Sequence, residues 1–221
     1  MKLNRLSVLI AVVVLPLVVY EAAFRSWCIY RHSLLWAAGG AFYVRRGVEG
    51  DRRLAVLDDP ATPGWIFLGG ADVDGGNIAI LDCYRGLRVL DLSGTKVTPS
   101  ALESLHGVSV DTLRLRGVRL GDTAGGFLEN FPSVRGLDLS NTGATDRIGP
   151  SIARLRNLTF ELDLSGTDVS DGIIPYVETL PGLPRVNLSG TRVTQSGVDR
   201  LRRVMMVDYR ATGAGAAAAD R

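Results

Sequence analysis

The sequence predicts an α/β solenoid of short stacked units, preceded by one hydrophobic helix that crosses a membrane. Three observations support this fold class. A short apolar-x-apolar core recurs six times at a nearly constant spacing, glycine and threonine follow most of these cores, and an uncharged run of 15 residues lies near the N-terminus. The 221 residues therefore divide into an anchor and a one-dimensional array of repeats.

The hydrophobic run near the N-terminus, LSVLIAVVVLPLVVY, predicts a membrane anchor. With Glu21 at the interface, the run extends to Phe24 and reaches 19 residues, close to the ~20 that are needed to cross hydrocarbon. A cleaved signal peptide is the alternative, but the residues after the run offer no A-x-A cleavage site. We expect a transmembrane anchor or signal-anchor over residues 1–25, which contacts the membrane through residues 6–24. A juxtamembrane segment and N-terminal cap should follow over residues 26–62.

The net charge differs between the N-terminal segment and the rest of the chain. Residues 1–53 hold 8 basic and 3 acidic residues, a net charge of +5, whereas residues 54–221 hold 17 and 20, a net charge of −3. A nucleic-acid-binding protein needs a basic stripe on its folded part, because neutralising phosphates supplies most of its affinity. The mildly acidic body therefore argues against nucleic acid as a partner. The two cysteines, Cys28 and Cys83, form no zinc-binding pattern.

The repeat array is expected over residues 63–212. The first apolar residues of the six cores are separated by 24, 23, 24, 25 and 24 residues, and a truncated seventh core begins at Val207. The six cores begin at Ile66, Leu90, Leu113, Leu137, Leu162 and Val186. No unit of this length can bury its apolar edge alone, so the units must stack into one continuous core. Residues 213–221 are mostly Ala and Gly, and we expect this tail to be disordered.

Each unit is predicted to combine a strand, a tight turn and a helical segment. In an L-x-L core the two leucines point to one face of a strand and the middle residue to the other. A following glycine permits a sharp bend, and the hydroxyl of the next threonine can bond a backbone group of the turn. These threonines are Thr95, Thr142, Thr167 and Thr191. Apolar residues at helical spacing, as in residues 175–180, predict the return on the opposite side, and one extra residue before Glu161 predicts a bulge.

This pattern resembles the leucine-rich repeat, L-x-x-L-x-L-x-x-N/C/T-x-L, over about two thirds of the chain. The 24-residue period and the G-T-x-V-T turn are most similar to the cysteine-containing or ribonuclease-inhibitor-like class. The resemblance implies short parallel strands on a concave face and helices on a convex face. The pattern departs from the family at Ala71 and Val118, which stand where the other units have threonine.

The whole layout also resembles bacterial single-pass membrane proteins that carry LDLSGTxVT repeats. In those proteins a Gly-Gly dipeptide followed by aromatic and β-branched residues often opens the repeat domain, and GGAFYV at residues 39–44 is similar. The resemblance implies a bacterial cell envelope location with the repeats outside the cytoplasm. The flanking charges nearly balance, because Lys2 and Arg5 precede the anchor while Arg25 and Arg31 follow it.

The outward strand residues of the concave face form the candidate binding surface. Aspartate recurs at the middle position of the strands, and Arg114 is expected between Asp91 and Asp138. The alternative is that each aspartate only bonds a neighbouring serine or water, since a residue can recur through repeat duplication alone. The candidate partner-binding residues are Trp65, Phe67, Asp91, Arg114, Arg116, Asp138, Glu161, Asp163 and Arg185.

Catalysis, a metal and a cofactor are not expected. A serine–histidine pair would need His106, which the repeat pattern places at the end of a convex helix, away from the concave serines. Asp138 with Asp163 would be a poor cation site, because calcium takes six to eight oxygen ligands and the neighbouring serines are weak ligands. No glycine pair belongs to a phosphate-binding G-x-x-x-x-G-K-[ST] loop.

The sequence therefore predicts a non-enzymatic module for protein–protein interaction, displayed at a membrane surface. The ligand is an unidentified protein, and the oligomeric state stays open. The first alternative is a structural or self-associating protein of the cell envelope, which a large apolar patch on the convex or terminal-repeat surface would favour. The second alternative is a substrate-recognition adaptor of an enzyme complex. Such adaptors normally have a helical recruiting domain where this chain has its hydrophobic segment.

Overall fold

The computed structural model describes residues 64–70, 73, 78, 81, 86–121 and 124–211. The expected anchor, juxtamembrane segment and C-terminal tail all lie outside these residues. Within the part of the chain that is described, no helix is both long enough and apolar enough to cross a membrane. The described residues belong to the expected repeat array.

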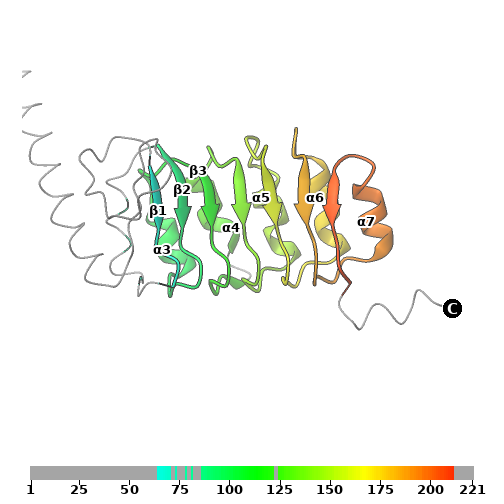
Figure 1. The fold of residues 1–221 in the computed structure, drawn as a ribbon, viewed down its shortest axis with the longest axis horizontal. Helices are drawn as coiled ribbons and strands as arrows, with labels where there is room; N and C mark the ends of the chain where they lie inside the picture. Colours follow the sequence, from blue (N-terminus) through cyan, green and yellow to red (C-terminus); the bar gives the residue numbers. More distant parts are fainter. Residues whose placement is uncertain are drawn as a thin grey trace, which may run out of the picture.

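Seven short strands form one parallel sheet, and their order in the sheet is their order in the chain (Figure 1). They are β1 (Trp65–Phe67), β2 (Leu87–Asp91), β3 (Val110–Arg114), β4 (Gly136–Asp138), β5 (Glu161–Asp163), β6 (Arg185–Asn187) and β7 (Met206–Asp208). Equivalent core residues pair in register, from Ile66 beside Leu90 at one end to Val186 beside Val207 at the other. Every predicted core, including the truncated seventh, therefore forms a strand.

A short helical segment lies between each pair of successive strands from β2 to β7. These segments are α3 (Pro99–Glu103), α4 (Ala124–Phe127) with η4 (Leu128–Asn130), η5 (Asp146–Ile148) with α5 (Gly149–Ile152), η6 (Asp171–Ile173) with α6 (Ile174–Glu178), and α7 (Gln195–Leu201), where η denotes a 3-10 helix. Figure 1 shows the helices stacked alongside the sheet in the same order as the strands. An α/β chain of this kind, with parallel strands and a helical segment between neighbours, is compatible with a solenoid.

Two of the helices begin with threonine caps. The Thr98 side chain accepts a hydrogen bond from the Ala101 N–H at the start of α3, and Pro99 occupies the first turn. The Thr194 side chain accepts from the Gly197 N–H at the start of α7. A capping hydroxyl satisfies a backbone donor that the helix itself leaves unpaired, and proline is pre-organised for the first turn. Local sequence therefore determines where these two helices begin.

The turn after a strand requires a residue in the left-handed backbone region. Gly94 and Gly166 occupy this position with φ values of 67° and 64°, a conformation that glycine adopts without a steric penalty. Asn141 takes the same position after β4 with a φ of 56°, and it is the only other type of residue with positive φ in the described part of the chain. The predicted glycine bend is confirmed, with asparagine as a substitute that tolerates the region.

A buried threonine closes four of these turns, as the sequence predicts. Its hydroxyl donates to the backbone carbonyl three residues earlier, and the Oγ1–O distances lie between 2.5 and 2.7 Å. The four donors are Thr95, Thr142, Thr167 and Thr191, and all are buried. A buried hydroxyl without a partner would destabilise the fold, so this hydrogen bond makes threonine acceptable inside the stack.

The extra residue before β5 is accommodated by a bulge, which confirms the sequence prediction. The backbone N–H groups of Thr159 and Phe160 both donate to the carbonyl of Arg135, at N–O distances of 3.1 and 2.7 Å. Two residues of one segment therefore oppose one residue of the next, and the strand register resumes at Glu161 beside Gly136.

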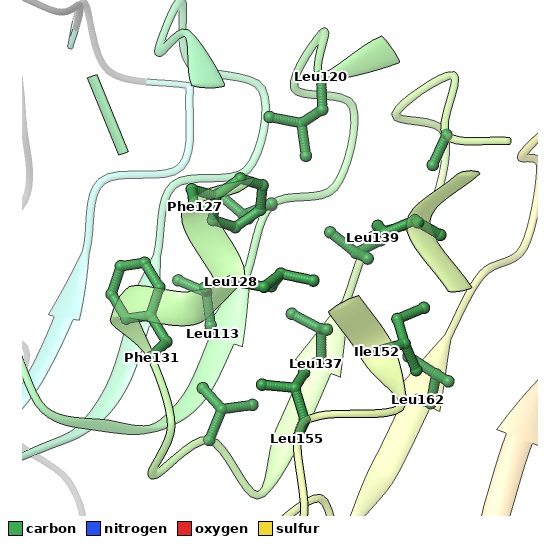
Figure 2. Close-up of a cluster of buried hydrophobic side chains, with 14 of the residues drawn as sticks. Leu113, Leu120, Phe127, Leu128, Phe131, Leu137, Leu139, Ile152, Leu155 and Leu162 are labelled. Carbon is green, nitrogen blue, oxygen red and sulfur yellow. The ribbon is translucent and has the colours of Figure 1, made fainter. Parts of the chain in front are cut away.

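The core runs through the stack as one cluster of buried aliphatic and aromatic side chains. Figure 2 shows how the strand leucines of neighbouring units and the helical side chains point into the same interior. Phe127 and Phe131 meet edge to face with ring centroids 6.3 Å apart, a favourable aromatic geometry. The labelled members of the cluster are Leu113, Leu120, Phe127, Leu128, Phe131, Leu137, Leu139, Ile152, Leu155 and Leu162.

Polar contacts also join successive units near the starts of their helices. The Asp171 carboxylate accepts hydrogen bonds from the backbone N–H and the hydroxyl of Thr194, at 2.8 and 2.7 Å. The Asp146 carboxylate accepts the same two hydrogen bonds from Ser170. In both pairs, an acidic residue at the start of one helical segment orients the capping residue of the next unit. The sequence analysis did not predict these contacts.

Leu162→Ala should lower the free energy of unfolding by about 2–5 kcal/mol, because this buried side chain packs between two neighbouring units. Equilibrium unfolding in urea, followed by circular dichroism, measures the change. Val204→Ala is the control, since Val204 is 63% exposed and its truncation should change the free energy by less than about 0.5 kcal/mol. Equal effects of the two substitutions would contradict the described core.

Candidate functional site

The strand side chains that point away from the core form a surface that we call the open face. It consists of the last residue of each strand, the residue two positions earlier, and Arg116, which follows the end of β3 by two positions. From β1 to β6 the core residues on either side of these last residues are buried, whereas the last residues themselves are only partly buried. The open face comprises Trp65, Phe67, Val89, Asp91, Thr112, Arg114, Arg116, Gly136, Asp138, Glu161, Asp163, Arg185, Asn187, Met206 and Asp208.

The parallel register places the last residues of all seven strands in one line. Phe67 lies beside Asp91, Asp91 beside Arg114, and the line continues to Asp208 on β7. Arg114 stands between Asp91 and Asp138 as predicted, and its Nη1 lies 4.0 Å from Asp91 Oδ2. Asp138 and Asp163 are direct neighbours of like charge. The sequence-predicted candidates on the strands therefore share one surface.

The recurring aspartates hold the turns that follow their strands. In the central part of the array, the Asp138 carboxylate accepts hydrogen bonds from the Ser140 N–H and hydroxyl, at 2.9 and 2.6 Å. The Asp163 carboxylate accepts from the Ser165 N–H at 2.8 Å. Asp91 makes the same contact with Ser93, and Asn187 replaces aspartate in the contact with Ser189. The sequence analysis left open whether the repeated aspartates bind a partner or only bond neighbouring serines. These contacts agree with the second explanation.

An ion pair lies on the open face at the C-terminal end of the sheet. Arg185 on β6 donates through Nε to the Asp208 carboxylate on β7, with a separation of 2.5 Å. This hydrogen bond raises the pKa of Arg185 above its ordinary value, and the charges of Asp208, Glu161 and Asp163 act in the same direction. Both partners are substantially exposed, so the pair orients the two side chains more than it stabilises the fold.

Arg116 and Glu161 are the two charged candidates without a hydrogen-bonded or ion-paired partner among the described residues. Both are exposed, and neither forms a salt bridge or a side-chain hydrogen bond with another described residue. Arg116 lies in the turn after β3, at the position that Ser140 and Ser165 occupy in later units. Among the described residues, these two charges can therefore meet a partner without breaking a hydrogen bond or a salt bridge.

Trp65 and Phe67 give the open face an apolar end at β1. Both side chains are partly buried, and Trp65 lies in register with Val89 on β2. The three side chains together form a less polar region than the charged strands that follow. The open face is therefore apolar at β1 and charged on the strands that follow.

Phe160 is an exposed aromatic residue that the sequence analysis missed. It lies at the bulge before β5 with 46% of its surface exposed, and the Arg135 guanidinium stands 4.0 Å from its ring centroid. This distance is typical of a cation–π contact. The extra residue before β5 could have indicated this position. It removes Phe160 from the repeat alignment and places it at the edge of the open face.

The open face can offer a partner charges, hydrogen-bond groups and aromatic side chains. In the described ranges, no group of three or more histidine, cysteine, aspartate or glutamate side chains is arranged to hold a metal ion. Asp138 and Asp163, the pair considered for a cation, instead accept hydrogen bonds from the turns and from Asn187 Nδ2, which lies 3.0 Å from Asp163.

Asp163→Ala should lower the free energy of unfolding by about 1–3 kcal/mol, because it removes the acceptor of the Ser165 N–H and the Asn187 side chain. Asp163→Asn is the matched variant, since the amide oxygen can still accept the Ser165 hydrogen bond, as Asn187 does for Ser189. Thermal and urea unfolding measure both. If Asp163→Ala were as stable as the wild type, the aspartates would not hold the turns.

Comparison with known proteins adds no assignment to this surface. No protein-family model matches the chain, and none of the curated proteins is significantly similar to it. The described side chains are therefore the basis on which a function can be proposed.

Proposed function

We propose that the protein is a leucine-rich-repeat module that binds another protein through the open face of its sheet, without catalysing a reaction. Support for the family comes from the phased cores, the left-handed turn residues and the buried threonines that follow them. In this proposal the open face is the concave face of the solenoid, and the helical segments lie on the convex face.

One observation carries this proposal. Two charged side chains of the open face make no hydrogen bond or salt bridge with the described residues. Asp138 and Asp163 stabilise turns, but Arg116 and Glu161 are exposed and make no salt bridge among the described residues. A side chain that contributes nothing to the fold is more informative about binding than one repeated for structural reasons. Arginine is also among the residues that dominate binding energies at protein interfaces.

The partner surface that fits the open face carries both signs of charge. Arg116 would pair with an acidic group of the partner and Glu161 with a basic group. The two side chains are separated by two strands, about 10 Å across the sheet, and by four residues, about 13 Å along the strands. The Arg185–Asp208 pair lies next along the sheet and can exchange its internal contact for contacts with the partner. Such a pattern favours specificity and a particular orientation of the partner over affinity alone.

The proposal places the module at a membrane, through residues 6–24. The support for this placement is the uncharged hydrophobic run in the sequence. By resemblance to bacterial single-pass proteins, the repeats would face away from the cytoplasm, within the cell envelope.

The double variant Arg116→Ala plus Glu161→Ala should reduce the affinity for the partner at least about tenfold, because both charged contacts are lost. The full-length protein, carrying a C-terminal tag, is cross-linked in membranes of its host cells, and the linked protein is identified by mass spectrometry. Its binding to the wild type and to the double variant is then measured with the purified partner.

Arg119→Ala is the matched control, because Arg119 is an exposed arginine of the turn after β3 that lies outside the open face. It should bind the partner as tightly as the wild type does. Equal affinity of the double variant and the wild type, with both proteins folded, would remove the open face as the binding surface.

A further inference from the structure

The segments that connect each helix to the next strand lie along one edge of the sheet, which we call the amino-edge rim. Because all strands are parallel, their amino ends meet at this edge. Backbone hydrogen bonds join neighbouring segments, as between Phe160 N and Arg135 O at 2.7 Å and between Met206 N and Pro184 O at 2.9 Å. The amino-edge rim comprises residues 104–109, 131–135, 153–160, 179–184 and 202–205.

Every Asp, Glu, Lys or Arg position on the amino-edge rim is an arginine. The five are Arg135, Arg154, Arg156, Arg202 and Arg203, and all are exposed. Two of them pair with carboxylates of the helical side, Arg154 with Glu129 and Arg202 with Asp199. The carboxylates that directly adjoin the rim segments in sequence are Glu103 at the end of α3, Glu161 at the start of β5, and Glu178 at the end of α6, which pairs with Arg200.

Three of the rim arginines have no carboxylate partner among the described residues. Arg156 Nη1 donates to the carbonyl of Thr179 at 3.3 Å, and Arg135 donates to Thr159 while its guanidinium stands over Phe160. Arg203 forms no side-chain hydrogen bond or ion pair in the described part. The positive charges of these three arginines are therefore not neutralised by a carboxylate of the described residues.

Exposed apolar side chains lie between these arginines. The exposed large hydrophobic side chains in the described ranges are Phe160, Val204 and Met206, with exposed fractions of 46, 63 and 69%. The first two belong to the amino-edge rim, and Met206 is the first residue of β7. The basic and apolar groups together extend from β4 to β7, about 14 Å along the sheet.

The opposite edge of the sheet provides a comparison within the same molecule. The segments that follow β2 to β6 are also basic, since they contain Lys96, Arg116, Arg119 and Arg192 against Asp122 and Asp168. However, none of the exposed large hydrophobic side chains of the described part lies there. The two edges therefore differ in the combination of charge with apolar surface, not in charge alone.

We propose that the amino-edge rim between β4 and β7 lies against an anionic lipid surface. Arginines attract acidic headgroups, and interspersed aromatic and aliphatic side chains enter the boundary between headgroups and acyl chains. A nucleic acid duplex would use the arginines but would gain nothing from Val204. The hydrophobic run of residues 6–24 would hold the array close to such a surface. The arginines, Phe160 and Val204 of this contact do not belong to the proposed protein-binding face, and Met206 lies at the boundary between the two surfaces.

Hydrogen exchange of the full-length protein tests the proposal. Exchange is compared in nanodiscs of neutral phosphatidylcholine and in nanodiscs that contain about one third phosphatidylglycerol. Peptides that cover residues 131–135, 153–160 and 202–205 should exchange at least about threefold more slowly with the anionic lipid. This protection should disappear at about 1 M salt, where exposed charges are screened within ~3 Å. Peptides of the opposite edge should not change.

The triple variant Arg135→Glu, Arg156→Glu and Arg203→Glu should lose the protection. The matched control is Lys96→Glu plus Arg119→Glu, which also reverses basic side chains but on the opposite edge, and it should keep the protection. Circular dichroism checks that both variants are folded. The comparison of lipids and of salt concentrations uses the wild type, so it remains decisive if a variant does not fold.

Three results would overturn the proposal. In the first, the rim peptides of the wild type exchange equally fast with both lipids. In the second, the control variant loses the protection as fully as the triple variant does. In the third, polyglutamate added to neutral nanodiscs protects the rim while anionic lipid does not, which would identify an acidic polypeptide as the partner instead.

Discussion

The structure depends on one constraint, which is that no unit of about 24 residues can bury its apolar side chains without a neighbour. Leu162 is buried because Leu137 and Val186 flank it in the sheet, and each of these needs its own neighbour in turn. The turn threonines and left-handed glycines contribute to the same stacking. They fix the turn after each strand, so that the chain reverses within one unit and the next strand pairs in register. The fold is therefore a sum of contacts between adjacent units.

This constraint explains why the strands and turns could be predicted from the sequence. A repeated burial requirement leaves a repeated pattern, so the register, the bend at Gly94 and the hydrogen bond of Thr167 could all be anticipated. Contacts that do not repeat in every unit left no such pattern. The Asp171–Thr194 contact joins residues 23 positions apart, and Phe160 owes its exposure to a single inserted residue.

The candidate site shows the same division between repeated and unrepeated residues. All sequence-predicted candidates lie on or beside one face, because the period of two along a strand determines which side chains leave the core. Their roles inside the fold could not be read from the pattern, since Asp163 and Glu161 are both acidic residues of β5 that point away from the core. Asp163 accepts hydrogen bonds from the turn and from Asn187, whereas Glu161 has no salt bridge among the described residues. Only the side-chain contacts show this difference in role.

Distances between spin labels at the turn positions, which lie two residues after the end of each strand, test the in-register stack most directly. One label replaces Ser93 and the second replaces, in separate variants, Ser140, Ser165, Ser189 or Arg210, in a chain whose Cys28 and Cys83 are changed to serine. Backbone hydrogen bonds link these positions from unit to unit. The account predicts a label separation that grows by about 5 Å with each added strand. Separations that do not increase in even steps would contradict the parallel stack.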